Sequence, residues 1–250
     1  MNQSALNTKN LYDELQFGNF SYGRKREIYD ALLIKFLKRI STNHKLFDIG
    51  CGGGYYMQTY HDYGIKKEQI TALDIGPSNI ERLKEFGYKA ICGDVLKLPL
   101  EDKISDFTIC QGVIHHTENP KQAFSELVRI TKLDGFIYLN VYNKWHPFFY
   151  IVHKLTTPLR FIYWNITSKI SDFLFPICKP FIQLISLFLF GENPDRQTSI
   201  QHFKDQILTT RAHLLSKSDI KKLAKENNCK VEELQYNRYC TMIAALIKCN

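Results

Sequence analysis

The sequence has no closely spaced pair of cysteines. Its seven cysteines fall at positions 51, 92, 110, 178, 229, 240 and 249, so no two are closer than nine residues. This spacing excludes a C-x-x-C metal or redox pair, and no cluster of histidine and cysteine indicates a metal site. We expect reduced thiols, most of which serve as small buried hydrophobic residues.

A secretion signal and a membrane-spanning run are also missing. The opening stretch, MNQSALNTKNLYDEL, does not show the basic-then-apolar order of a signal peptide. The longest uninterrupted apolar-rich piece, FIQLISLFLF, has about half of the roughly 20 residues that a transmembrane helix needs. We therefore expect a cytoplasmic protein without a transmembrane helix.

Repeats and low-complexity segments are absent as well, and the composition is that of a globular protein. The chain has 250 residues, of which 44% are hydrophobic and 23% are charged. This length suits one large domain, or a domain with an insertion. The net charge of +8 suits an anionic partner such as nucleic acid or a lipid headgroup, although many cytosolic proteins are mildly basic without one.

What the chain does contain is an alternation of predicted strands and helices. Strands are expected at 45–49, 70–74, 88–92, 105–111 and 135–141, with helices ending near 64 and covering 78–86 and 120–131. Alternation at this spacing predicts an α/β fold whose parallel sheet is covered on both faces.

Further helices are expected on both sides of this alternation. Apolar residues form one helical stripe over 25–40. Ser216, with Asp219 three residues on, predicts the start of a helix that ends near Asn227–Asn228. Strands at about 230–237 and 241–248 follow, and their short connection requires an antiparallel hairpin.

A glycine-rich loop follows the first predicted strand, in KLFDIGCGGGYYMQ. Gly50 and Gly52 match the dinucleotide fingerprint G-x-G-x-x-G, but Tyr55 occupies the third glycine position. Asp48 would also lie beside two phosphate charges. A ligand with a cationic end and no phosphates therefore suits this loop better, and the loop backbone with the helix N-terminus can hold its carboxylate.

Three acids lie at or just after the ends of successive predicted strands: Asp48, Asp74 and Asp94. In open α/β sheets, ligands bind outside the carboxyl ends of the strands. Asp74 is well placed to accept hydrogen bonds from two ribose hydroxyls, and Asp94 from an adenine amino group. With the glycine loop, these acids indicate an adenosine that carries a cationic amino-acid end, as in S-adenosylmethionine.

Five ordered segments resemble the class I S-adenosylmethionine-dependent methyltransferase family, and its type 11 members in particular. They are LFDIGCGGG, ALDIGPSNI, GDVLKLP, DFTICQGVIHHTENP and AFSELVRITKLDGFIYL. The last segment usually ends in Leu-Lys-Pro-Gly-Gly. Here Leu133 and Asp134 replace the proline and one glycine, a change that touches a turn and not the cofactor pocket.

The resemblance implies S-adenosylmethionine as cofactor and a set of residues that bind it. Asp48, Gly50 and Gly52 would line its methionine part, Asp74 its ribose and Asp94 with Val95 its adenine, while Gln111 and the backbone to Ile114 close the pocket. The complete set that we predict is Asp48, Gly50, Cys51, Gly52, Asp74, Ile75, Asp94, Val95, Gln111 and Gly112.

The family's fold also implies how the chain is divided. Its Rossmann-like sheet has seven strands, mostly parallel, with the last strand antiparallel. We expect an N-terminal helical lid over 1–44, a cofactor-binding core over 45–141, a helical insertion over 142–215 and a C-terminal helix with a hairpin over 216–250. The insertion then falls between the fifth strand and the last large helix, where family members often recognise their substrates.

The insertion is the best pointer to the substrate. Residues 141–190 hold 13 of the 33 aromatic residues, and five basic residues against one acid. One interpretation is a helical subdomain that packs its own core. The other is a lid over an apolar or lipid-linked acceptor, with peripheral membrane contact through 145–190.

The methyl acceptor leaves a weaker trace. His116 and His115 follow the fourth strand and are the candidate catalytic bases for O- or C-methylation of a small acceptor; Tyr142 and His146 rank lower. GVIHHTENPKQAFSEL also resembles a segment of tRNA wobble-uridine methyltransferases, which leaves tRNA as an alternative acceptor. We do not expect nucleic acid as a partner, because the positive charge lies among apolar residues. A non-catalytic cofactor-binding homologue is the third alternative.

Overall fold

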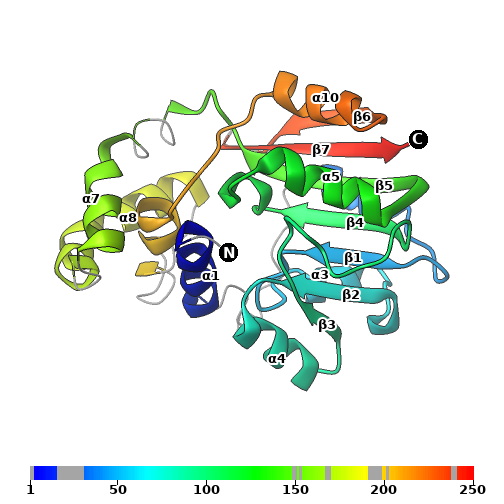
Figure 1. The fold of residues 1–250 in the computed structure, drawn as a ribbon, viewed down its shortest axis with the longest axis horizontal. Coiled ribbons are helices and arrows are strands. Elements are labelled where there is room, and N and C mark those ends of the chain that lie inside the picture. The colour runs from blue at the N-terminus through cyan, green and yellow to red at the C-terminus, as the bar shows by residue number, and fades with distance from the viewer. Residues whose placement is uncertain are drawn as a thin grey trace.

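The computed structural model describes residues 3–15, 31–147, 151, 154–166, 170–190, 199–200, 203–237 and 241–250. Its centre is a seven-stranded sheet in the order β3-β2-β1-β4-β5-β7-β6 (Figure 1). The strands are β1 (Leu46–Ile49), β2 (Ile70–Asp74), β3 (Lys89–Cys92), β4 (Ser105–Gln111), β5 (Thr131–Tyr142), β6 (Cys229–Tyr236) and β7 (Met242–Cys249).

The pairing of the strands confirms the predicted fold class. Strands β3, β2, β1, β4 and β5 pair in parallel, and β7 runs antiparallel between β5 and β6. Every residue of β1 and β2 is buried, as expected for parallel strands that are covered on both faces. The hairpin of β6 and β7 completes the sheet.

Two hydrophobic clusters lie on the two faces of the sheet. One packs α5 (Pro120–Ile130) and α10 (Lys217–Glu226) against the sheet. The other packs α2 (Ala31–Leu37), α3 (Met57–Asp62) and α4 (Pro77–Glu85). The described part of the predicted 25–40 stripe is therefore confirmed as a core-facing helix, and residues 25–30 lie outside the described residues.

The predicted end signals of α10 are confirmed, whereas the predicted start of β5 is wrong. Ser216 and Asp219 form a reciprocal capping box, and Asn228 takes a left-handed conformation with φ 55°. β5 begins at Thr131 and not at 135, because Thr131 pairs with Ser105 before a β-bulge shifts the register. The turn at Leu133 and Asp134 lies inside this early part of the strand.

The described part of the insertion is largely helical, and its residues 209–215 are not helical. It contains α7 (Thr157–Asn165), α8 (Ile170–Phe190) and the short π-helix η3 (Lys204–Leu208). A small cluster of its own, centred on Tyr163, Ile182 and Phe203, packs these helices together. Among the described residues, no helix meets the length and hydropathy needed to cross a membrane.

These helices lie beyond the carboxyl ends of the parallel strands. The carboxyl ends of the parallel strands point toward α7, α8 and the N-terminal helix α1 (Gln3–Leu15) (Figure 1). α1 contacts α4, and its Tyr12 hydroxyl donates a hydrogen bond to Asp205 of η3 at 3.1 Å. In this kind of fold, ligands bind at the carboxyl ends of the strands. This is therefore the end of the sheet that α1 and the insertion cover.

Candidate functional site

The ten residues predicted to bind the cofactor lie at the carboxyl ends of β1 to β4 or directly after them. Because these strands are parallel neighbours in the sheet, their carboxyl ends meet along one edge. The structure brings together Asp48, Gly50, Cys51, Gly52, Asp74, Ile75, Asp94, Val95, Gln111 and Gly112 at this edge.

The conformation of the glycine loop after β1 is set by contacts within the protein. Gly50, Gly52 and Gly54 have φ values of 76°, 53° and 90°, which glycine adopts without strain. A Cβ at Gly50 would lie 2.2 Å from Cγ2 of Val113. The close approach that requires glycine at position 50 is therefore to a neighbouring side chain.

Asp74 connects the loop to the next helix. Its carboxylate accepts hydrogen bonds from the backbone N–H of Gly52 at 2.9 Å, from that of Gly76 at 2.8 Å and from the Asn79 side chain at 3.1 Å. Burial raises the pKa of Asp74, and these hydrogen bonds oppose that rise. Asp74 therefore holds the glycine loop against the start of α4 as well as ending β2.

Asp48 is a buried acid with one phenolic partner. The Tyr60 hydroxyl of α3 donates to its Oδ2 at 2.9 Å. Burial raises the pKa of Asp48 to about 7, with a smaller rise from Asp74 and an opposing effect of the Tyr60 hydrogen bond. A cation beside Asp48 would restore the charge of this carboxylate, so the position suits the positive end of a ligand.

The last two pairs of predicted cofactor residues follow β3 and β4. Asp94 Oδ1 accepts from the backbone N–H of Leu96 at 2.9 Å, and Val95 is buried. The Gln111 Nε2 atom is buried and has no hydrogen-bond partner among the described residues. Since a buried donor without a partner is costly, this amide is suited to donate to a ligand at the edge. A Cβ at Gly112 would meet nothing within 4 Å, so space adjoins it.

The two candidate histidines lie in the 3₁₀ turn η2 (Ile114–His116) after β4, and their surroundings differ. His115 is fully buried, and its ring centre lies 4.0 Å from that of Tyr142. His116 Nδ1 lies 2.8 Å from the Arg211 carbonyl oxygen. Because a carbonyl only accepts, Nδ1 carries the proton and Nε2 presents a lone pair. Burial lowers the pKa of His116, whereas Asp205 and the Arg211 carbonyl raise it.

Asp205 and Tyr12 belong to this site although nothing in the sequence indicated them. Asp205 accepts from the Tyr12 hydroxyl on Oδ1 and from the Tyr142 hydroxyl on Oδ2, each at 3.1 Å. Oδ1 also lies 4.0 Å from Nε2 of His116. Tyr142 was a lower-ranked candidate, whereas Tyr12 and Asp205 are separated by 193 positions and show no motif. His146 is partly buried.

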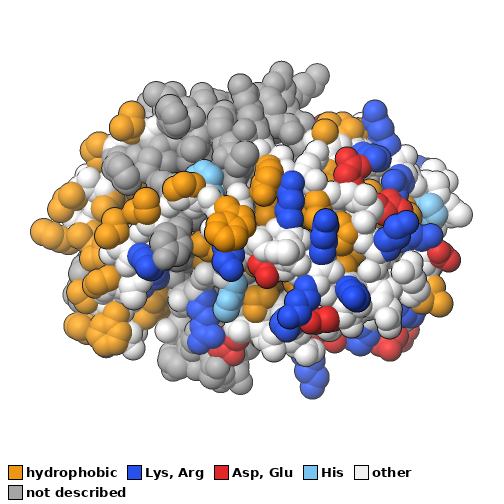
Figure 2. Space-filling model, turned by 90° about the horizontal axis from the view of Figure 1, so that it is seen from above, with side chains coloured by type: hydrophobic (Ala, Val, Ile, Leu, Met, Phe, Trp, Pro, Cys, Tyr) orange, Lys and Arg blue, Asp and Glu red, His pale blue; other side chains and the backbone are white. Residues whose placement is uncertain are grey.

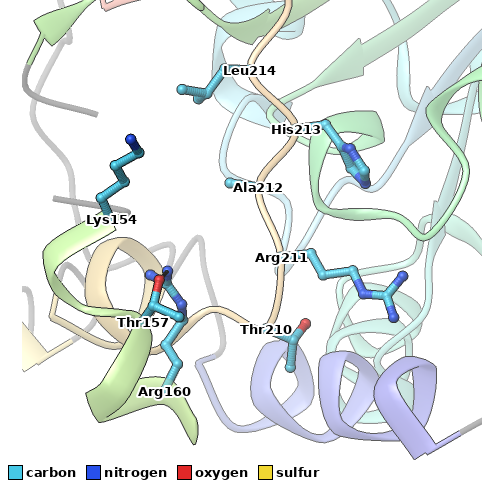
Figure 3. A pocket seen from close by; sticks show the side chains of 8 residues that line it. All are labelled: Lys154, Thr157, Arg160, Thr210, Arg211, Ala212, His213 and Leu214. Atoms are coloured by element: carbon cyan, nitrogen blue, oxygen red, sulfur yellow. Dashed lines mark hydrogen bonds between the residues drawn. The ribbon is translucent and has the colours of Figure 1, made fainter. Parts of the chain in front are cut away.

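A cavity of about 390 Å³ lies between α7 and the segment 210–214 (Figure 3). Lys154 and Arg160 line its α7 side, and the Arg160 guanidinium donates to the hydroxyl oxygens of Thr156 and Thr157. The side chains of Arg211 and His213 point away from Lys154 and Arg160 in Figure 3. The same segment reaches the histidine pair through its backbone, since the His213 N–H donates to the His115 carbonyl at 2.7 Å.

The described residues contain no group of three or more His, Cys, Asp or Glu side chains that could hold a metal ion.

The part of the chain that forms this region is similar to known proteins. Residues 47–139 match the family described as a methyltransferase domain. A tRNA (carboxymethyluridine(34)-5-O)-methyltransferase of Arabidopsis thaliana is 31% identical over 126 residues, which are 45% of this chain and 30% of that protein. A ubiquinone biosynthesis O-methyltransferase of Rickettsia conorii is 33% identical over 108 residues, which are 40% of this chain and 35% of that protein.

These matches span about a third of the relatives' lengths. A solved structure, the PH0226 protein of Pyrococcus horikoshii OT3, covers 94% of this chain and 95% of its own with a TM-score of 0.57. At 19% identity this likeness concerns the fold.

Proposed function

We propose that the protein, whose residues 47–139 match the family described as a methyltransferase domain, is a class I S-adenosylmethionine-dependent methyltransferase. It transfers the methyl group to a small, apolar or lipid-linked acceptor, at oxygen or carbon. The observation that carries this proposal is the line of Asp48, Asp74 and Asp94 at the carboxyl edge of the sheet, next to the glycine loop.

The residues present fit the cofactor. Asp48 and the glycine loop would hold its cationic methionine part, and Asp74 would bind the ribose. Asp94 and Val95 would border the adenine, and the buried amide of Gln111 offers a donor that no described residue uses. When bound, S-adenosylmethionine supplies an activated methyl group.

His116 is the residue that we propose as base. Its lowered pKa keeps the imidazole neutral at physiological pH, and the Arg211 carbonyl leaves Nε2 as the proton acceptor. His115 is fully buried and packed against Tyr142, so we assign it a role in shaping the site.

The surface of the insertion supports an apolar or lipid-linked acceptor. Large hydrophobic side chains that are more than half exposed gather on it, as Figure 2 shows at the end formed by α7 and α8. On α8, Phe173, Ile177 and Leu184 recur at helical spacing and are 71%, 64% and 64% exposed. Others lie before α7, within it or directly after it: Trp145, Ile151, Leu155, Phe161 and Ile166.

Basic residues accompany this apolar surface, and we propose that it contacts an anionic membrane. Lys154 and Arg160 line the cavity beside α7, next to the exposed Leu155 and Phe161. An apolar face with interspersed cations is the composition that binds the headgroup region of anionic bilayers. A lipid-linked acceptor would then be delivered at the end of the molecule that carries the histidine pair.

Methyl transfer is tested by incubating the protein with labelled S-adenosylmethionine and a prenylated catechol, then analysing the products by mass spectrometry. We expect a methylated catechol, and a loss of about 100-fold or more in the rate of methylation for His116→Ala. His44→Ala is the matched control and should keep the wild-type rate. Binding of the cofactor without methylation of any probe in a broad acceptor panel would favour the non-catalytic alternative.

Membrane contact is tested separately by sedimentation with vesicles. Phosphatidylcholine vesicles that contain phosphatidylglycerol should sediment the wild-type protein, and pure phosphatidylcholine vesicles should sediment less of it. Phe173→Ser with Ile177→Ser should reduce binding, whereas Leu133→Ser, an exposed leucine at the opposite end of β5, should not. Equal sedimentation of the double variant and wild type would contradict the membrane proposal.

A tRNA acceptor is the second candidate, because the Arabidopsis thaliana relative is named for that activity. It predicts salt-sensitive binding of bulk tRNA and methylation of a wobble-uridine oligonucleotide. Methylation of this oligonucleotide in preference to the catechol would replace the small-acceptor proposal.

A further inference from the structure

The carboxylate of Asp205 is the point at which separate parts of the chain meet at the site. The hydroxyls of Tyr12 from α1 and Tyr142 from β5 donate to its two oxygens, each at 3.1 Å. His116 Nε2 from η2 lies 4.0 Å from Oδ1. The Asp205 side chain is 14% exposed and that of His116 is 6% exposed. A partly buried carboxylate held by two donors therefore faces the nitrogen that can accept a proton.

The imidazole of His116 is fixed in orientation by the segment after η3. Nδ1 donates to the Arg211 carbonyl at 2.8 Å, and the Thr209 hydroxyl lies 3.3 Å from the same nitrogen. Nε2 is thus the acceptor, and a proton gained there would face Asp205. The ionisable groups around His116 are Tyr12 from α1, His115 from η2, Tyr142 from β5, Asp205 from η3, and Arg211 with His213 from the following segment.

We propose that Asp205 is a positioning residue for methyl transfer to a hydroxyl: Tyr12 and Tyr142 hold its carboxylate where it stabilises the positive charge that His116 gains on taking the acceptor's proton. This inference rests on the proposed function and adds to it the acceptor class and a residue of the insertion. α1 contributes Tyr12, so the helix that covers the edge also completes the site.

The step balances with the groups that are present. The acceptor hydroxyl gives its proton to His116 Nε2, and its oxygen forms the new bond to the methyl carbon. The carbon–sulfur bond of the methyl donor breaks and leaves its electron pair on sulfur. His116 becomes an imidazolium opposite the Asp205 carboxylate and later loses the proton to solvent.

A hydroxyl acceptor fits this arrangement better than an amine. A protonated amine would carry its own positive charge and would compete with the imidazolium for the Asp205 carboxylate. His116 Nε2 would then have no neutral acceptor group from which to take a proton. A phenol approaches as a neutral group and needs both a base and a stabilised imidazolium. A matched pair of probes, 4-methylcatechol and 4-methylbenzylamine, separates the two classes.

The test is a pH titration of His116 by nuclear magnetic resonance with ¹³Cε1-labelled histidine, assigned with His116→Gln. Asp205→Asn removes the negative charge and should lower the titration midpoint of His116 by about half a pH unit or more. Asp134→Asn alters an exposed carboxylate that pairs with Lys248 at 2.8 Å, and should leave the midpoint unchanged.

The tyrosine variants provide a test of opposite sign, and they remain informative where Asp205→Asn fails to fold. Tyr12→Phe and Tyr142→Phe each remove one donor from the carboxylate, so its negative charge acts more strongly on His116. Because the other tyrosine still holds the carboxylate in place, the His116 midpoint should rise in each variant, and Tyr236→Phe on β6 is the control. An unchanged or lowered midpoint would contradict the role proposed for the tyrosines. A change of packing alone would move the aspartate and tyrosine variants in the same direction.

Activity and probe binding complete the experiment. 4-Methylcatechol should shift the His116 resonance of the wild type, and 4-methylbenzylamine should not. With the catechol as acceptor, kcat should fall at least about tenfold in Asp205→Asn, with the acid limb of the pH profile moved to lower pH.

Equal His116 midpoints in wild type and Asp205→Asn, or methylation of the amine alone, would overturn the inference. Calorimetry with S-adenosylmethionine on the same samples keeps the two proposals apart. If the wild type does not bind the cofactor the proposed function fails, whereas the coupling between Asp205 and His116 is measured without it.

Discussion

At the scale of single residues, Gly50 changes how the glycine loop is understood. The loop first indicates a close approach of backbone to ligand, but at Gly50 the neighbour is the Val113 side chain. The glycine is therefore required by the packing of β1 against the turn after β4. Gly50 is thus needed for internal packing, and the other glycines of the loop are left for contact with a ligand.

Gly50→Ala should destabilise the fold more than Gly64→Ala. Both glycines have positive φ, 76° and 79°, so both variants carry a backbone strain of about 1–2 kcal/mol. A Cβ at Gly64 meets nothing within 4 Å, whereas one at Gly50 meets Val113 at 2.2 Å. The clash should add about 1–3 kcal/mol. Urea unfolding measures the difference, and equal losses in the two variants would contradict the packing argument.

Asp48 should make cofactor affinity depend on pH. Its pKa of about 7 means that the free carboxyl is largely protonated below neutrality. A cationic ligand favours the carboxylate, so affinity should rise with pH through about 7 and be about tenfold weaker at pH 6 than at pH 8. Calorimetry at both pH values tests this.

Two variants check that Asp48 causes this dependence. Asp48→Asn should abolish it. Tyr60→Phe removes the donor that lowers the pKa of Asp48, so the rise in affinity should move to higher pH. An unchanged pH dependence in Asp48→Asn would assign the effect to another group.

At the scale of elements, α1 is held over the edge by polar contacts at its C-terminal half. Asp13 Oδ1 accepts from the Ser78 backbone N–H at 2.9 Å, at the start of α4 where the helix dipole favours an acid. Tyr12, the residue before Asp13, donates a hydrogen bond to Asp205 of η3. α1 is thus attached both to the cofactor-binding core and to the insertion.

Asp13→Ala should loosen α1 without unfolding the sheet. Losing this cap-like hydrogen bond costs about 0.5–2 kcal/mol, which should speed amide hydrogen exchange in α1 by roughly two- to thirty-fold. Exchange in β1 and β4 should not change. Asp62→Ala on α3, where the exposed carboxylate accepts a hydrogen bond from the Gln58 side chain, is the control. Unchanged exchange in α1 would show that Asp13 does not hold this helix.

The elements themselves were largely predictable because their signals are local. The β2 and β4 bounds match the predicted 70–74 and 105–111, since short apolar runs between turn residues predict buried strands. The start of β5 was not predictable, because Thr131 becomes strand only by pairing with Ser105. Hydrophobic pattern does not show such a long-range pairing.

The same distinction applies to the site. Asp48, Asp74 and Asp94 were predictable because parallel strands bring their carboxyl ends together whatever the rest of the chain does. Asp205 and Tyr12 were not, since their contact joins positions 193 apart through the docking of two separate helices. Tyr60 was not predicted either, because a single tyrosine in the mostly polar helix α3 shows no pattern that points to Asp48.

At the scale of the whole molecule, the two ends of the sheet differ in character. The carboxyl end carries the predicted cofactor residues, the histidine pair, α1 and the insertion with its exposed apolar side chains. The amino end carries the turn at Leu133 and Asp134, where Lys248 pairs with Asp134. Cofactor, acceptor and membrane would all meet the protein at the same end.

The central claim is that this end of the sheet binds S-adenosylmethionine, and calorimetric titration of wild type and Asp74→Ala with that cofactor tests it most directly. The wild type should bind, and the variant should lose about 1.5–3 kcal/mol of binding free energy, or roughly ten- to 150-fold in affinity, as a charged hydrogen-bond partner is removed. Asp62→Ala should bind like wild type. An unchanged affinity in Asp74→Ala, or no binding by the wild type, would contradict the account.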